Sequence, residues 1–259
     1  RTSPYAFQGL GEEGLKIFDI SRPISSTLVK VMDPVEGARI NPVGISLLGD
    51  YAYLAGGEQG VHVVNVLDKN IPTEIVRIIP GPEPDVRNLS VVAYTNPAYQ
   101  AAGQDPFQVD PRSPFAQLFA YVANGQYGLR VYDISNVKDR QPVEIPLDEA
   151  TQAIPGVVMD VAIDRDRAYL AVDGSGVFVL DTTNPGHPKY LGYINLSASV
   201  NKASSLVKRG GLIYLAGLEN GLQILRDSFT APELLAQFAA PAAMQNMVVQ
   251  AEYVYAVDG

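Results

Sequence analysis

The sequence predicts an all-β fold made of repeated units, and three observations carry that prediction. A glycine that opens an apolar strand recurs with a spacing of about 46 residues, apart from one interval that is about 20 residues longer, at Gly14, Gly60, Gly128, Gly176 and Gly221. A strand with the pattern Ala-Tyr-Leu/Val-Ala or a close variant precedes the glycine in four copies. The composition, 47% hydrophobic with 23 Gly and 19 Pro, fits many short strands joined by tight turns.

Each repeat is expected to contain four strands, taken in chain order. An apolar run comes first, followed by the tyrosine strand, for example Phe119 to Ala123, and then the strand after the glycine, for example Leu129 to Ile134. An Asp or Asn near the end of that third strand, at Asp19, Asn65, Asp133 and Asp181, is expected to bond nearby backbone amides and start a turn. A proline then precedes the last strand, which we expect to be outermost because proline is tolerated mainly at sheet edges.

Four short antiparallel strands in about 45 residues are typical of a β-propeller blade. The sequence therefore predicts a single all-β domain over 1–259, a β-propeller with four complete blades of four antiparallel strands and partial blades at both termini. The complete blades are expected at 43–79, 88–147, 157–194 and 203–238, and the partial ones at 5–31 and 246–259. The two terminal pieces would together supply five strands, whereas one blade needs four. This surplus suggests a further blade beyond Gly259, so that the domain is incomplete at its C-terminus. The alternative is a five-bladed ring with Arg1 to Leu10 as a tail.

These repeats resemble the LVIVD repeat family of β-propeller proteins. The resemblance is carried by AYVANGQYGLRVYDISN at Ala120 to Asn136 and by AYLAVDGSGVFVLDTTNPGHP at Ala168 to Pro188. It implies the propeller fold and an exported or cell-surface location, as for many bacterial and archaeal members. It implies no activity, because the family has no shared catalytic motif to transfer.

One blade carries an insertion, Asn96 to Ser113, between its first and second strands. Its text, NPAYQAAGQDPFQVDPRS, has no helical periodicity and predicts a loop, and a loop of this length is uncommon unless it is functional or mobile. One interpretation is a contact loop that presents Tyr99, Phe107 and Asp110. The other is variation in loop length without a function.

The composition excludes several classes of site. The formal net charge of -9 argues against nucleic acid or an anionic membrane as the main partner. The chain has no cysteine, so it can form no disulfide, zinc-thiolate or iron-sulfur site. No apolar run approaches the roughly 20 residues that a transmembrane helix needs. Together with the family resemblance, this predicts a secreted, cell-surface or periplasmic protein.

Candidate chemistry is sparse. The two histidines, His62 and His187, lie in different repeats and in no metal-ligand or nucleophile-base spacing. The first position of the innermost strand forms a mostly polar column: Gly44, Asn88, Asp160, Ser205 and Asn246. In a propeller these positions recur around the channel, so Asn88, Asp160 and Asn246 are weak candidates for a metal, and acids on nearby loops, such as Asp33, Glu36, Glu83 and Asp85, could add oxygen ligands for Ca²⁺. The alternative is that these side chains bond the adjoining turns.

The leading functional hypothesis is a non-enzymatic propeller module that contacts other proteins or an unidentified ligand, within a larger polypeptide or assembly. No cofactor and no catalytic residue are predicted for it. A cation-dependent hydrolase or lyase with its site at the channel mouth is one alternative. A structural subunit of a surface layer or filament is another.

Overall fold

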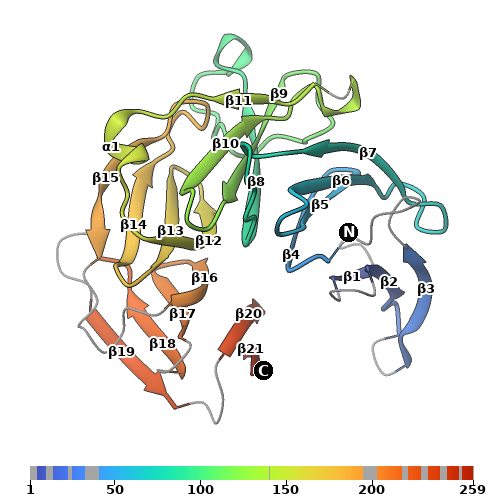
Figure 1. Ribbon diagram of the computed structural model, residues 1–259. Helices are drawn as coiled ribbons and strands as arrows, with labels where there is room; N and C mark the ends of the chain where they lie inside the picture. The colour runs from blue at the N-terminus through green and yellow to red at the C-terminus, as the bar shows by residue number, and fades with distance from the viewer. Residues whose placement is uncertain are drawn as a thin grey trace. The chain divides into compact units, whose positions relative to one another are not determined.

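A computed structural model describes residues 5–9, 14–22, 25–32, 41–139, 141–194, 203–217, 221–228, 233–239, 244–250 and 253–258 (Figure 1). Strands dominate it. The only α-helix among these residues is the single turn α1 (Glu149–Gln152), which the sequence analysis did not anticipate, and Asp148 caps it by accepting a hydrogen bond from the Thr151 amide. Two 3-10 turns, η3 (Pro97–Tyr99) and η4 (Val137–Asp139), lie in connections.

The strands form antiparallel sheets that follow one another along the chain. Four sheets have four strands, in the orders β4-β5-β6-β7, β8-β9-β10-β11, β12-β13-β14-β15 and β16-β17-β18-β19; a three-stranded sheet, β1-β2-β3, precedes them and a hairpin, β20-β21, follows. This confirms the predicted all-β propeller with four-stranded antiparallel blades. Because β1 pairs with β2 over its whole length, residues 5–9 form a strand and not a tail.

The bounds of the strands agree closely with the repeats in the sequence. In the first three sheets they are β1 (Tyr5–Gly9), β2 (Leu15–Asp19), β3 (Thr27–Met32), β4 (Gly44–Leu48), β5 (Tyr51–Ala55), β6 (Val61–Asn65), β7 (Thr73–Ile78), β8 (Asn88–Thr95), β9 (Ala116–Ala123), β10 (Leu129–Asp133) and β11 (Val143–Ile145). In the last three they are β12 (Val157–Asp164), β13 (Arg167–Asp173), β14 (Gly176–Asp181), β15 (Lys189–Ile194), β16 (Ala203–Arg209), β17 (Leu212–Gly217), β18 (Gly221–Arg226), β19 (Glu233–Phe238), β20 (Met244–Gln250) and β21 (Tyr253–Asp258).

The turn after each third strand forms as the sequence predicts. The side-chain oxygens of Asp19, Asn65, Asp133 and Asp181 each accept a hydrogen bond from the backbone amide two residues later, at 2.8 to 2.9 Å. These bonds start the connection to the last strand of each sheet. That last strand lies at the edge of its sheet, as the preceding proline predicts.

The repeated glycine and tyrosine have different structural roles. Gly60 has φ +82°, and a Cβ there would lie 2.3 Å from the carbonyl oxygen of Ile78, so this tight turn between β5 and β6 requires glycine. Tyr53, Tyr121 and Tyr169 are among the largest fully buried side chains. The middle strands therefore supply the core, and β5 is buried at every position.

The chain divides into two compact units, Arg1–Ala120 with Asp133–Val143, and Tyr121–Tyr132 with Glu144–Gly259. In the first unit, apolar residues of β2 pack against those of β5 and β6 around Leu15, Ile17, Leu54 and Val64. In the second, β13 and β14 pack against β16 and β17 around Tyr169, Val179, Leu206 and Leu215. No helix among the described residues has the length and apolar character to cross a bilayer.

Candidate functional site

The insertion predicted from the sequence connects β8 to β9, and its two ends are joined by backbone hydrogen bonds. The Asn96 amide donates to the Phe115 carbonyl oxygen at 2.8 Å, and the Thr95 amide donates to the Pro106 carbonyl oxygen at 2.7 Å. Apart from η3 the segment contains no helix and no strand, as the sequence indicates. It is therefore a loop that folds back on its own base, and we call residues 96–115 the insertion loop.

The three loop residues that the sequence singled out have different surroundings. Phe107 packs edge-on against Tyr94 of β8, with ring centroids 5.2 Å apart, and so fixes the loop to its own sheet. Tyr99 is 60% exposed and lies against Phe115, at 4.7 Å between centroids. Asp110 is exposed and accepts a hydrogen bond from the Arg112 amide at 2.9 Å. Only Tyr99 presents a large side chain outward.

An ion pair fastens the end of the insertion loop to the neighbouring sheet. The Nε and Nη2 atoms of Arg112 both donate to Oδ1 of Asp50, at 2.9 and 2.7 Å. This hydrogen bond is also the main reason that the pKa of Arg112 is raised. Asp50 lies in the turn between β4 and β5, so the contact joins segments 62 residues apart within the first unit.

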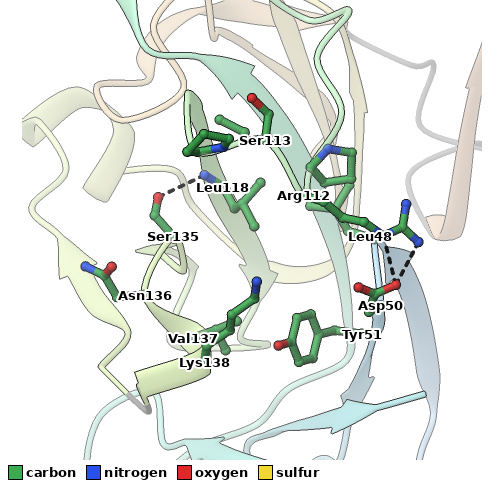
Figure 2. A pocket seen from close by; sticks show the side chains of 14 residues that line it. Leu48, Asp50, Tyr51, Arg112, Ser113, Leu118, Ser135, Asn136, Val137 and Lys138 are labelled. Carbon is green, nitrogen blue, oxygen red and sulfur yellow. Dashed lines mark hydrogen bonds and ion pairs between the residues drawn. The ribbon is translucent and has the colours of Figure 1, made fainter. Parts of the chain in front are cut away.

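A pocket of about 390 Å³ opens beside this ion pair (Figure 2). All of its lining residues belong to the first unit, and they come from three connections: the β4–β5 turn, the end of the insertion loop with the start of β9, and the turn after β10. Leu48, Pro111, Pro114, Leu118 and Val137 form its apolar walls. This volume is within the range of small-molecule sites in proteins.

The polar groups of the pocket are mainly hydrogen-bond donors. Figure 2 shows the Lys138 side chain pointing into the pocket between Ser135 and Tyr51. The oxygen of Ser135 accepts a hydrogen bond from the Leu118 amide at 3.0 Å, which leaves its own proton available to donate. Burial, with the charge of Asp50 beside it, raises the pKa of Tyr51, so its hydroxyl stays protonated. Among the described residues neither the Tyr51 hydroxyl nor the Lys138 ammonium has a hydrogen-bond or ion-pair partner.

The polar column on the innermost strands makes backbone contacts. Asp160 is only 3% exposed; its Oδ1 accepts from the Val161 amide and its Oδ2 from the Leu206 amide of β16, both at 2.7 Å. The carboxylate thus connects the first strands of two successive sheets in the second unit. These contacts are those of a structural group that stabilises the packing of one sheet on the next.

The other members of the column behave similarly. Asn88 accepts from the Leu89 amide at 2.9 Å, and a Cβ at Gly44 would lie 2.3 Å from its Oδ1, so glycine at position 44 makes room for this side chain. Asn246 accepts from the Met247 amide at 2.8 Å and from the Ser205 hydroxyl at 3.3 Å. In the part of the chain that the structure describes, no three His, Cys, Asp or Glu side chains are grouped closely enough to hold a metal ion. A cation at Asn88, Asp160 or Asn246 stays a prediction.

None of the remaining candidates that the structure describes is among the lining residues of the pocket. Asp33 and Glu36 lie outside the described residues, and Asp85 forms an ion pair with Arg87 at 2.7 Å. His62 is fully buried on β6, and its Nδ1 is 2.9 Å from Oε1 of Glu74. His187 lies in the turn before β15, where the Gly186 amide donates to the Asn184 side chain at 3.1 Å.

The residues that the sequence analysis named in the insertion, Tyr99, Phe107 and Asp110, do not line the pocket. Arg112 falls inside the predicted insertion, whereas Asp50 lies in an ordinary four-residue turn, Tyr51 has the position of a core residue, and Lys138 lies in a polar turn. The signal that could have pointed to them is the long insertion itself, because a loop of this length must lie against neighbouring connections.

The successive four-stranded antiparallel sheets define the chain as a β-propeller protein. A family model described as "LVIVD repeat" matches residues 43–78, 118–138 and 155–195. These three stretches of the β-propeller thus match LVIVD repeats, as the sequence resemblance indicated. The insertion loop falls between the first two matched segments. A search of curated proteins finds no match.

Solved structures similar to this chain are β-propellers of low sequence identity. A computationally designed protein, Ika8, shares 9% identity at a TM-score of 0.58, with 99% of this chain and 65% of that chain covered. The U3-55K protein and the WD40 repeats of RRP9 each share 13% identity at 0.58, with 94% and 66% covered. A chain of the mitotic checkpoint complex shares 14% identity at 0.58, with 94% and 64% covered. The chain thus spans just under two thirds of the length of these neighbours, and the likeness shows the fold alone.

Proposed function

We propose that this protein is a non-enzymatic binding module, and that it contacts its ligand or partner through the insertion loop and the pocket beside it. The observation that carries the proposal is that the one enlarged loop of the repeats builds the wall of the described pocket in the first unit. Repeated contacts, such as the Asp and Asn turns, serve the scaffold. The insertion loop belongs to one sheet only, and it adds an exposed aromatic side chain, Tyr99. The unpartnered donors of the pocket, Tyr51 and Lys138, come from the neighbouring connections.

The similar structures resemble this chain in fold, and they do not by themselves indicate a function. Two of them come from assemblies or repeat domains named in their descriptions, a mitotic checkpoint complex and a WD40 repeat protein. β-Propellers serve many unrelated functions, so the support for a binding function comes from the pocket and not from the fold. We also propose that the module is exported or displayed at the cell surface as part of a larger polypeptide or assembly; the support for this location is the resemblance to the LVIVD family.

Site-specific photo-crosslinking tests the binding proposal. A photoreactive amino acid replaces Tyr99, which is 60% exposed on the insertion loop, or Tyr193, a control that is 52% exposed on β15. We expect discrete crosslinked products in the native host from position 99 only. The products should weaken when Arg112→Ala removes the ion pair with Asp50 that fastens the loop.

Two results would contradict the proposal. One is the same set of products from positions 99 and 193, which would indicate contact with the whole surface. The other is no product from position 99 together with unchanged assembly after deletion of residues 96–113. The location is tested separately: protease added to intact cells should cleave the protein if it is displayed, and should leave it intact if it is internal.

A further inference from the structure

The pocket beside the insertion loop has an unusual balance of donors and acceptors, and this balance indicates the chemistry of its ligand. The groups that point into it, the Lys138 ammonium and the hydroxyls of Tyr51 and Ser135, can all donate hydrogen bonds. The Ser135 oxygen already accepts from the Leu118 amide. The carboxylate among the lining residues, Asp50, accepts two hydrogen bonds from Arg112, both at Oδ1, so its charge is already paired with a guanidinium.

A ligand in this pocket must therefore supply acceptors. A cationic ligand, such as an amine, would be repelled by the Lys138 ammonium, and the one carboxylate of the lining, Asp50, is already paired with Arg112. A carboxylate has two oxygens and about four acceptor positions, which suits one ammonium and two hydroxyl donors. The exposed amide of Asn136, at the edge of the lining, can donate as well.

The charges of the lining residues favour a single negative charge. Arg112 is paired with Asp50 at 2.7 Å and lies 3.8 Å from Asp110, so the positive charge left in the lining is that of Lys138. Asp110 and Asp139 are adjacent in the sequence to lining residues but do not line the pocket. A monoanion would neutralise the lining, whereas a dianionic phosphate would leave an uncompensated charge in a partly enclosed site.

The apolar walls of the pocket indicate the character of the rest of the ligand. Leu48, Leu118 and Val137 are apolar, and Pro111 and Pro114 extend the apolar surface from the insertion loop. Leu118 and Val137 are buried even though they border the pocket. The volume of about 390 Å³ exceeds what an isolated carboxylate occupies, so an apolar body is expected beside the charged group.

We propose that this pocket binds a carboxylate attached to an apolar body, such as a free N-acyl amino acid or the C-terminal residue of a peptide. Lys138 supplies the charge, Tyr51 and Ser135 donate to the carboxylate oxygens, and the Arg112–Asp50 pair holds the wall of the pocket in place. This inference rests on the proposed binding function and specifies its ligand class.

Binding can be measured by NMR, through the amide resonance of Leu118, which donates to Ser135 at the pocket wall. The probes are N-acetyl-leucine, its primary amide, and N-acetyl-leucinol phosphate. A tetrapeptide ending in leucine, with a free or an amidated C-terminus, distinguishes a peptide source from a free acid. We expect N-acetyl-leucine to bind at least about ten-fold more tightly than its amide and than the phosphate. Tighter binding by the free tetrapeptide than by N-acetyl-leucine would identify the peptide as the source.

Variants test the assigned donors. Lys138→Met should weaken binding of N-acetyl-leucine by about ten-fold or more, and Tyr51→Phe by a smaller factor, because a charged donor contributes more than a neutral one. Lys189→Met, on exposed β15 of the second unit, is the matched control, since it makes the same change in net charge. Its affinity should equal that of the unmodified protein.

The proposal is overturned if the amide binds as well as the acid, or if no carboxylate shifts the Leu118 resonance at about 20 mM, a concentration that detects interactions of only a few kcal/mol. Equal weakening by Lys138→Met and Lys189→Met would reduce the effect to net charge and would also overturn it. These failures are distinct from failure of the binding function, because crosslinking from position 99 depends on no assumption about the ligand.

Discussion

Two lysines of this chain have opposite surroundings. The side chain of Lys208, on β16, is 3% exposed; its Nζ lies 3.0 Å from Oδ2 of Asp164 and 3.2 Å from Oδ2 of Asp227, and 5.5 Å from the ring centre of Tyr169. The Tyr169 hydroxyl completes the group by donating to Asp227 at 2.8 Å. Lys138, in the first unit, is exposed, points into a pocket, and has no ion-pair partner among the described residues.

The difference separates polar groups that serve the scaffold from those available to a ligand. A buried charge is tolerated only where the chain supplies its partners, as it does for Lys208. An exposed charge is solvated by water and needs no partner within the chain, so its side chain can bind a ligand. Completeness of hydrogen bonding within the chain is therefore a better guide to function here than residue type or repeat position.

Lys208→Met tests the scaffold side of this comparison and should have the largest effect. It leaves the Asp164 and Asp227 carboxylates without their cation, and breaking a buried ion pair on one side costs about 3 to 5 kcal/mol. Because the Asp164 side chain is 37% exposed, we expect the lower end, about 3 kcal/mol off the free energy of unfolding, measured by urea titration.

The matched variant is Lys138→Met. It removes an exposed lysine without ion-pair partners in the described part of the chain, so the free energy of unfolding should change by less than about 0.5 kcal/mol. Similar losses of stability from both variants would break the distinction between the two lysines.

Two buried tyrosines, Tyr53 and Tyr121, lie on the second strands of their sheets and differ in whether the hydroxyl has a partner. They extend the comparison of partnered and unpartnered groups to a smaller expected effect. The hydroxyl of Tyr121 donates to the Pro185 carbonyl oxygen at 2.7 Å, whereas the buried hydroxyl of Tyr53 has no partner among the described residues. Tyr121→Phe should lower the free energy of unfolding by about 1 to 2 kcal/mol, and Tyr53→Phe should leave it unchanged or raise it. Thermal unfolding of both variants checks this. A loss above about 1 kcal/mol in Tyr53→Phe would show that its hydroxyl is bonded after all, for example to a buried water.

His62 is the intermediate case, with one ring nitrogen partnered and one not. Nδ1 lies 2.9 Å from Glu74, while the buried Nε2 has no partner among the described residues. Burial lowers the pKa of His62 below its usual 6.5, and the hydrogen bond with Glu74 opposes this only in part. The unfolded chain therefore binds the extra proton first as the pH falls.

The resulting pH dependence has a definite sign. The stabilisation from neutral His62 is fully present above pH 6.5 and is lost as the pH falls from there through the lower pKa of the folded state. Unfolding free energies between pH 5 and 8 should fall more steeply below 6.5 for the unmodified protein than for His62→Gln. Parallel curves would show that the Glu74 contact offsets burial completely.

Much of the fold could be read from the sequence because it depends on local chemistry. Glycine at position 60 is required by a positive φ, and in four sheets the Asp or Asn that ends the strand after the glycine accepts a hydrogen bond from the amide two residues on. Such rules act within a few residues and repeat with the blade. The helix α1 escaped prediction because its four residues are too few to show a periodic pattern.

The pocket could be predicted only in part, for the same physical reason. The predicted insertion contains Arg112, but nothing in its sequence singled that residue out, and its partner Asp50 is 62 residues away. Tyr51 and Lys138 reach the pocket through the packing of neighbouring connections, which no local pattern records. Conversely, the polar column at Asn88, Asp160 and Asn246 was predicted as a possible ligand site, and its side-chain oxygens accept hydrogen bonds from backbone amides.

The closed base of the insertion loop makes it a natural position for protein engineering. Because the Asn96 amide bonds the Phe115 carbonyl at 2.8 Å, the two ends of the loop are already held at the spacing of paired strands. A reporter domain with adjacent termini, placed between them, would leave the pairing of β8 with β9 undisturbed.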